Sequence, residues 1–180
     1  MHDRRPGPVV VVSCGSMFLA AAGAAIAQSM QRAAFGANNG NVEGSVTSYT
    51  FAPDGAPQFV GKFITGAGSG NAGNNAYGIS LTPSGRYLAI THATAASVFE
   101  RITMFRVNAD ATLTLVGTFQ TPDSPLAAAW INDTYLAVTL TNTSAPNKVI
   151  VYRFEAAGPT LVEVDRRDSG GFTGYLAVHP

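Results

Sequence analysis

Short runs rich in Val, Ile, Thr, Tyr and Phe follow one another along the chain, and turn residues separate them. Such runs are typical of β-strands that are half buried in a sheet. One run, Tyr87-Leu88-Ala89-Ile90-Thr91, returns 48 residues later as Tyr135-Leu136-Ala137-Val138-Thr139. No long stretch with helical periodicity follows Gln28. The pattern therefore predicts an all-β protein that is built from repeats.

Each repeat contains two further recurring runs. One carries an aromatic residue at its fourth position, and it occurs at Val46 to Phe51, Ile102 to Val107 and Val149 to Phe154. The other is a Val-Gly-x-Phe run, which occurs at Phe59 to Phe63 and Leu115 to Phe119 and, more loosely, at Leu161 to Val164. Four strand-like runs in a period near 48 residues indicate the four-stranded antiparallel blades of a β-propeller.

These runs define the expected blades. Inner strands are predicted at Tyr77 to Thr82, Leu126 to Ile131 and Tyr175 to His179, with blades at about 28–66, 76–120 and 125–166 and one further strand at 173–179. The first blade begins with its second strand, at 32–37, and so has three strands. Because closed propellers have about four to eight blades, we expect about three blades of an incomplete propeller. An alternative is self-association, in which the last strand of one chain completes the first blade of another.

Loop lengths differ systematically between the strands. Tight turns are predicted at 53–55, 83–85 and 108–110, and longer connections at 65–76, 92–101, 142–148 and 167–173. Successive antiparallel strands place alternate loops at opposite ends. The tight turns should therefore share one face, the tight-turn face, and the longer connections the other, the long-loop face. Binding residues concentrate on long loops of a rigid scaffold, so function is expected on the long-loop face.

The first 27 residues differ from the rest. Arg4 and Arg5 precede an apolar stretch from Val9 to Ala27, and Ala25-Ile26-Ala27 has the small-x-small pattern of a signal-peptidase site. Residues 1–27 are therefore predicted to be a signal peptide, residues 28–180 the propeller domain, and the protein secreted or periplasmic. One alternative is an uncleaved membrane anchor. Another is a lipid anchor on Cys14, which ends a lipoprotein-like Val-Val-Ser-Cys sequence.

The amino-acid composition argues against several kinds of partner and site for this chain. Eleven basic and eleven acidic residues cancel, and no basic run is present, so nucleic acid is not expected as a partner. Cys14 is the only cysteine, which excludes a disulfide or a thiolate metal site from the mature chain. The few histidines lie at no metal-ligand spacing. The Gly68-x-Gly70-x-x-Gly73 run lacks the following helix and acidic residue of a dinucleotide site. No metal and no cofactor are expected.

His92, Glu100 and Arg101 form the best local group of reactive side chains. His92 ends a second strand, and the other two follow after one long connection. Beside the channel mouth, His92 would act as a general base on water while Arg101 holds an anionic group of the substrate. The alternative is a solvated loop with an incidental ion pair. The candidate ligand-binding residues are Asn71, Asn75, Asn142 and Arg167.

The chain resembles the propeller lactonases, a family with YVTN-type repeats that includes proteins similar to bacterial 6-phosphogluconolactonase and 3-carboxymuconate cyclase. The resemblance rests on Ile102 to Val107, on Leu113 to Gly117, and on Gly170-Gly171 leading into Tyr175 to Pro180. It implies a seven-bladed propeller, of which this chain would be the N-terminal part. Second strands in the family commonly end in Ala-Asn-Glu or Ala-Asn-Ala. Here Ala37-Asn38-Asn39 fits loosely, whereas Thr91-His92-Ala93 departs from that pattern.

Two functions follow. The first is an exported lactonase that opens a sugar or aromatic lactone by directing water at the ester carbonyl, without metal or cofactor. The alternative is a non-catalytic propeller that binds a glycan or a protein at the cell surface. Asn-rich loops favour the alternative, because amides suit neutral ligands that carry hydroxyl groups. The expected partners are a small-molecule lactone or glycan and, through strand edges, other copies of the chain. No membrane association is expected after signal cleavage.

Overall fold

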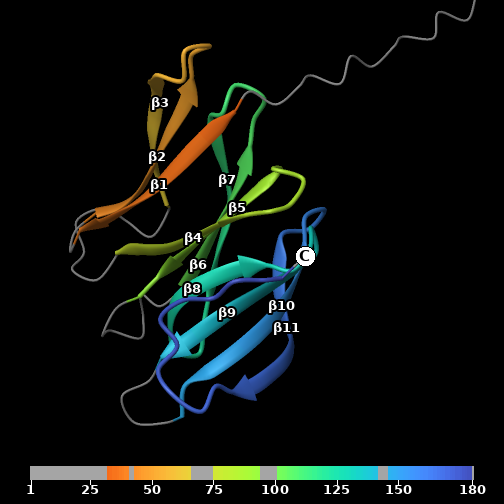
Figure 1. Ribbon diagram of the computed structural model, residues 1–180. Helices are drawn as coiled ribbons and strands as arrows, with labels where there is room; N and C mark the ends of the chain where they lie inside the picture. Colours follow the sequence, from red (N-terminus) through yellow and green to blue (C-terminus); the bar gives the residue numbers. More distant parts are fainter. Residues whose placement is uncertain (1–31, 41–42, 66–74, 94–100, 142–145, 180) are drawn as a thin grey trace, which may run out of the picture.

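The computed structural model describes residues 32–40, 43–65, 75–93, 101–141 and 146–179. Every regular element among them is a β-strand, and the strands form three antiparallel sheets that follow one another along the chain (Figure 1). The sheets stand side by side in an open row. The prediction of an all-β chain made of propeller blades is confirmed.

Each sheet corresponds to one predicted blade. Blade 1 has the order β1-β2-β3, with β1 at Ala33–Gly40, β2 at Glu43–Phe51 and β3 at Pro57–Ile64. Blade 2 has the order β4-β5-β6-β7, with β4 at Ala76–Leu81, β5 at Tyr87–His92, β6 at Arg101–Val107 and β7 at Leu113–Gln120. Blade 3 has the order β8-β9-β10-β11, with β8 at Ser124–Trp130, β9 at Tyr135–Thr141, β10 at Lys148–Glu155 and β11 at Thr160–Asp168.

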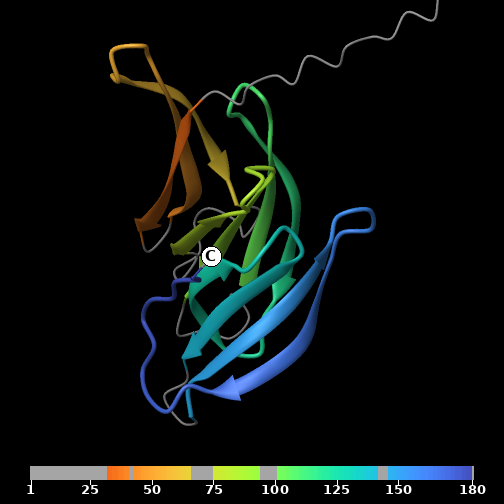
Figure 2. The same cartoon turned by 45° about the vertical axis from the view of Figure 1, so that its right-hand side comes forward.

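The loops alternate as predicted. The hairpins that join β2 to β3, β4 to β5 and β6 to β7 close at one end of the blades, and the strand ends that the longer connections join lie at the other end. The inner strands β4 and β8 contact each other, and β1 contacts β4 (Figure 2). β3, β7 and β11 are the outer edges of their sheets. This order places the inner strands along the side of the row that would face a channel.

The blades pack through two apolar clusters. Leu88 and Ile90 of β5 belong to the cluster shared with blade 1, whereas Ala89 belongs to the cluster shared with blade 3. Successive side chains of a strand point to opposite faces, so β5 buries both faces, and its central residues Leu88, Ala89 and Ile90 are all apolar. Burial of a Leu or Ile side chain contributes about 1.5–3 kcal/mol, and these clusters are the main source of contact between blades.

The recurring Val-Gly-x-Phe run is a β-bulge in the outer strand. Ser48 pairs with Gly61 and Tyr49 with Phe59, so Val60 has no opposite residue, and β7 repeats this irregularity opposite Met104 and Phe105. A bulge sets two residues of one strand against one of its neighbour. The ring of Phe63 lies over Gly61, where a β-carbon would be 3.1 Å from Phe63 Cζ.

Blade 3 keeps this bulge but changes its chemistry. β10 and β11 shift register between Val151 and Tyr152. At the positions of the glycine and the phenylalanine, β11 has Asp165 and Arg167, which form an ion pair of 3.3 Å between Arg167 Nε and Asp165 Oδ2. The outermost strand of blade 3 is therefore polar where those of blades 1 and 2 carry an aromatic ring.

The structure differs from the prediction of an inner strand at Tyr175 to His179. Residues 172–179 form no strand, and no described strand pairs with them. A strand is maintained by the hydrogen bonds of a neighbouring strand, and a strand-like sequence without such a neighbour does not form a ladder. The segment instead passes beside the inner strands of blades 2 and 3 (Figures 1 and 2).

Candidate functional site

A groove of about 420 Å³ lies between β4, β8 and the C-terminal segment. Its lining includes Asn39, Tyr77, Gly78, Leu126, Ala127 and Tyr175. Asn39 is near the end of β1 that leads through residues 41–42 into β2, and Tyr77 is near the start of β4, which follows a longer connection. The groove therefore lies at the long-loop end of the inner strands.

The polar side chains of the groove are neutral. Tyr77 is 47% exposed and Tyr175 is 92% exposed, and Asn39 is also exposed. A phenol and a carboxamide can both donate and accept hydrogen bonds, and an aromatic ring offers an apolar face for stacking. The other lining residues are Gly, Ala, Ile and Leu. The groove can thus bind a ligand that combines hydroxyl groups with an apolar ring face.

The wall of the groove is held by a hydrogen-bonded contact between blades. The Gly78 N–H donates to Thr91 Oγ1 at 2.8 Å, and the Thr91 hydroxyl donates to the Leu126 carbonyl at 2.7 Å. A β-carbon on Gly78 would lie 2.4 Å from that carbonyl oxygen, a separation that atoms do not reach without displacement. Glycine at this position therefore allows β4 to approach β8 closely.

The same local arrangement recurs in blade 3. The Ala127 N–H donates to Thr139 Oγ1 at 3.0 Å, and the ladder between β8 and β9 shifts register there, as the ladder between β4 and β5 does around Gly78. Each inner strand thus has a bulge that a threonine of the second strand stabilises. This device orients the inner strands beside the groove.

Trp130 fixes the other end of the contact between the inner strands. Its Nε1–H donates to the Ser80 carbonyl at 3.1 Å and its backbone N–H donates to Ser80 Oγ at 3.2 Å. Its ring packs edge-on against Phe154, with centroids 6.0 Å apart, and only 5% of the residue is exposed. Trp130 is therefore a core residue and not a stacking platform for a ligand.

His92 lies inside the junction between blades 1 and 2. Its ring is fully buried, and Nε2 is 3.0 Å from Thr103 Oγ1. The Thr103 hydroxyl donates its one proton to the Thr65 carbonyl at 2.9 Å, so it must accept from His92, and Nε2 carries a proton. His92 pairs across the ladder with Arg101, which is half buried. The catalytic role of His92 stays a prediction.

Of the other predicted site residues, the structure describes Asn75 and Arg167. Glu100, Asn71 and Asn142 lie outside the described residues. Asn75 precedes β4 by one residue, and its Oδ1 is buried without a hydrogen-bond partner among the described residues. Arg167 is on β11, at the opposite edge of the sheet from β8, which lines the groove. Of these residues, Asn75 is the one that adjoins the groove in sequence.

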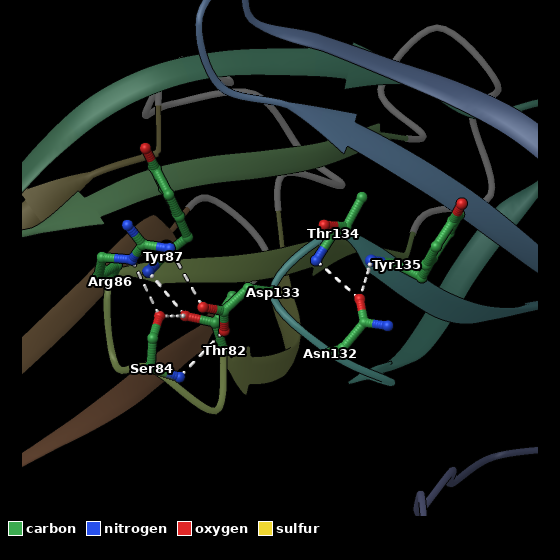
Figure 3. A network of polar contacts seen from close by, with 8 residues as sticks. All are labelled: Thr82, Ser84, Arg86, Tyr87, Asn132, Asp133, Thr134 and Tyr135. Atoms are coloured by element: carbon green, nitrogen blue, oxygen red, sulfur yellow. Dashed lines mark hydrogen bonds and ion pairs between the residues drawn. The ribbon is translucent and has the colours of Figure 1, made fainter.

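A polar network links blades 2 and 3 on the tight-turn face (Figure 3). Asp133, in the turn after β8, accepts from the Ser84 N–H at 3.0 Å and from Arg86 Nη2 at 3.2 Å. The Ser84 backbone hydrogen bond, with a further contribution from Arg86, holds the pKa of Asp133 below its ordinary value of 3.8. Asn132 Oδ1 closes its own turn by accepting from the Thr134 and Tyr135 N–H groups. This face is occupied by contacts that join blades.

Sequence reasoning did not single out Tyr77 and Tyr175 as site residues, although the signal was present. Both stand at the start of a predicted inner strand, two repeat periods apart. Inner strands border the channel of a propeller, so a large polar aromatic residue at such a position has no core to enter. Both tyrosines are exposed and line the groove.

Among the described residues, no group of three or more His, Cys, Asp or Glu side chains is placed to hold a metal ion. The described part of the chain also has no helix that is long and apolar enough to cross a membrane.

Comparison with known proteins gives matches among solved structures alone. No family model matches the chain, and no curated protein matches its sequence. A protein of unknown function from Desulfotomaculum acetoxidans is similar over 72% of this chain and 37% of its own length, with 21% identity and a TM-score of 0.56. A candidate 6-phosphogluconolactonase from Bacteroides uniformis shares 21% identity over 72% of this chain and 35% of its own, also with a TM-score of 0.56.

The periplasmic gluconolactonase of Pseudomonas aeruginosa is a further structural neighbour. It is similar over 72% of this chain and 35% of its own length, with 15% identity and a TM-score of 0.58. This chain thus spans about a third of the length of these structures. At such identities a structural likeness establishes a fold and not an activity. The described residues have the fold of consecutive β-propeller blades, as found in lactonase-like propellers.

Proposed function

We propose that this chain forms part of an exported lactonase-like propeller and that its groove holds a sugar or aromatic lactone. The observation that carries the proposal is the groove itself, because Tyr77, Asn39 and Tyr175 converge on it at the long-loop end of the inner strands. The fold shared with lactonase-like propellers supports the same reading. Phenol and amide groups would orient the ring hydroxyls of a lactone toward an attacking water.

Ring opening needs a proton acceptor as well as orientation. Water adds to the ester carbonyl, the tetrahedral intermediate collapses, and the ring oxygen leaves with a proton. No residue that lines the groove in the described chain is ionised near neutral pH. We assign the proton transfer to the group predicted from the sequence, His92 with Glu100 and Arg101. The metal-independent mechanism belongs to the same proposal.

Hydrolysis of several lactones, followed in a pH-stat after subtraction of the spontaneous rate, tests the proposal. Tyr77→Ala is expected to lower kcat/KM at least about tenfold, the effect of losing about 1.4 kcal/mol of transition-state binding. His92→Ala is expected to lower kcat by about 10²- to 10⁴-fold, the range of a general base. Tyr135→Ala, on the tight-turn face, is the matched control.

Two outcomes answer separate questions. Unchanged hydrolysis in His92→Ala would show that His92 has no part in the mechanism, and the groove would still be the proposed substrate site. Absence of hydrolysis in the unaltered protein would contradict the proposal that it is an enzyme.

A second candidate function is binding without catalysis, of a glycan or a protein at the cell surface. The neutral lining of the groove favours it, because a catalytic mouth usually gathers perturbed acids and bases. A glycan array separates the two functions. Retention of a neutral glycan by the unaltered protein and not by Tyr77→Ala, with no hydrolysis of any lactone, is the result expected of a binding propeller.

Export is part of the first proposal. The apolar stretch before Ala25-Ile26-Ala27 motivates it, and so does the periplasmic location of the Pseudomonas aeruginosa gluconolactonase. Mass spectrometry of the mature N-terminus is expected to find Gln28 as the first residue. A cytoplasmic product that begins at Met1 would contradict export, and a diacylated Cys14 would replace cleavage at Gln28 with a lipid anchor.

A further inference from the structure

Positive charge is absent from the lining of the groove. No Lys or Arg is among the residues that line the groove. Arg101, the cation at the long-loop end of blade 2, begins β6, is half buried and pairs across the ladder with His92. β6 contributes no residue to the lining of the groove.

The cations of blade 3 are engaged in ion pairs. Lys148 pairs with Asp168 across the β10–β11 ladder, and Arg167 pairs with Asp165. Arg166 binds Glu163 through two hydrogen bonds of 2.7 and 2.8 Å. Arg166 and Arg167 lie on β11, the outer edge of the sheet, and Lys148 lies on the neighbouring β10, so β9 separates all three cations from β8.

A phosphorylated ligand would find little to bind in such a groove. Proteins bind phosphate groups through Arg or Lys, or through the N-terminus of a helix. The described chain contains no helix. Removing a phosphate dianion from water without an opposite charge costs more than a nearby phenol or amide returns. The groove is suited instead to uncharged rings, whose hydroxyl groups Tyr77 and Asn39 can bind.

Resting on the proposed lactonase function, we infer that the ligand held by this groove is a neutral lactone without a phosphate group. The inference refines the substrate class and concerns the part of the ligand that β4, β8 and Tyr175 contact. It separates this chain from an enzyme whose substrate is a 6-phosphorylated sugar lactone.

A binding measurement tests the inference without turnover. The probes are a sugar lactam, which is a neutral lactone analogue that does not hydrolyse, and the 6-phosphate of the same lactam, titrated calorimetrically into the full chain. The neutral lactam is expected to bind at least about tenfold more tightly. Tyr77→Ala should weaken binding of the neutral lactam, whereas Tyr135→Ala should not change it.

A gain-of-function variant provides the complementary test. Leu126→Arg introduces one guanidinium into the groove and is expected to tighten binding of the phosphorylated lactam at least about tenfold while weakening the neutral one. Equal or tighter binding of the phosphorylated lactam by the unaltered protein would overturn the inference. The proposed lactonase function would not be affected by that result. Tight binding of the neutral lactam without any lactone hydrolysis would support a neutral ligand in the groove and would contradict the proposed lactonase activity. Failure of both probes to bind would overturn the inference.

Discussion

Thr91 is fully buried and serves two backbone groups at once, one in its own blade and one in the next. Thr91→Val keeps the shape of the side chain but leaves the Gly78 N–H and the Leu126 carbonyl without their partner. Buried polar groups left unsatisfied cost about 1–3 kcal/mol each. We expect the free energy of unfolding, measured in urea, to fall by about 1–3 kcal/mol or more.

The matched control for Thr91 is Thr118→Val, at an exposed position on β7. Substitutions at such positions change stability by about 0.5 kcal/mol or less. Equal losses in the two variants would show that the contact between β4 and β8 does not depend on the threonine hydroxyl.

Tyr152 contrasts with Thr91, because its buried hydroxyl forms no hydrogen bond with the described residues. Burial, which disfavours the phenolate, raises the pKa of Tyr152 from 10.0 to about 12. Because the pKa is higher in the folded state, the contribution of this group to stability is fully present below pH 10 and is lost as the pH rises to 12.

We therefore predict that Tyr152→Phe is at least as stable as the unaltered protein at pH 7, since it removes a hydroxyl that forms no bond. Between pH 10 and 12 the variant should lose less stability than the parent does. Denaturation midpoints at pH 7 and at high pH measure both effects, with Tyr175→Phe as an exposed control. A clearly lower stability of Tyr152→Phe at pH 7 would mean that the Tyr152 hydroxyl forms a hydrogen bond.

At the scale of single elements, the turn after β8 couples two blades through Asp133. Its pKa in the folded protein is lowered below 3.8, first by the Ser84 N–H and then by Arg86. A group whose pKa falls on folding stabilises the protein above its unfolded pKa and loses that effect as the pH falls through the folded value. The unaltered protein should be more stable than Asp133→Ala at pH 7, and the difference should shrink below about pH 3.8.

Arg86→Ala separates the two causes. Because the backbone hydrogen bond from Ser84 is the larger one, an NMR titration should find the pKa of Asp133 still below 3.8 in this variant. A return to the ordinary value would assign the effect to the ion pair instead.

How far the elements could be predicted depends on the range of the interactions that form them. The Val-Gly-x-Phe repeat marked the outer strands of blades 1 and 2 correctly, because the bulge forms within one hairpin, and blade 3 keeps the bulge with Asp165 in place of the glycine. Tyr175 to His179 has an inner-strand sequence but forms no strand, since a ladder depends on a neighbouring strand that the local sequence cannot reveal.

The candidate site was harder to predict for the same reason. The sequence distance between His92 and Thr65 gave no sign that a hydrogen-bonded chain through Thr103 would bury the imidazole between blades. The groove depends on four separate segments, around Asn39, Tyr77, Leu126 and Tyr175. Only the packing of the blades brings these segments to one place.

At the scale of the whole molecule, the strand edges predict self-association. β1 has no partner strand on its inner side among the described residues, and Phe59, on the outer edge strand of the same blade, is 63% exposed. Unpaired edges invite pairing with other chains. We expect residues 28–180 to sediment as assemblies larger than a monomer.

Deletion of residues 172–179 distinguishes the routes of assembly. If the last segment of one chain completes blade 1 of another, the deletion should restore smaller species, whereas pairing through outer edges should persist. A stable, well-folded monomer in the undeleted protein would contradict the prediction.

Gly78 also bears on how many blades such a row needs to close on itself. The angle between two neighbouring blades is set by the spacing of their inner strands relative to that of their outer strands. The absence of a side chain at Gly78 brings β4 and β8 together near the axis and so widens that angle. A methyl group there would separate the inner strands and make the blades more nearly parallel, so more of them would be required to complete a circle. The size of the residue at the Gly78 position therefore helps to determine how many blades a closed ring of this kind would contain.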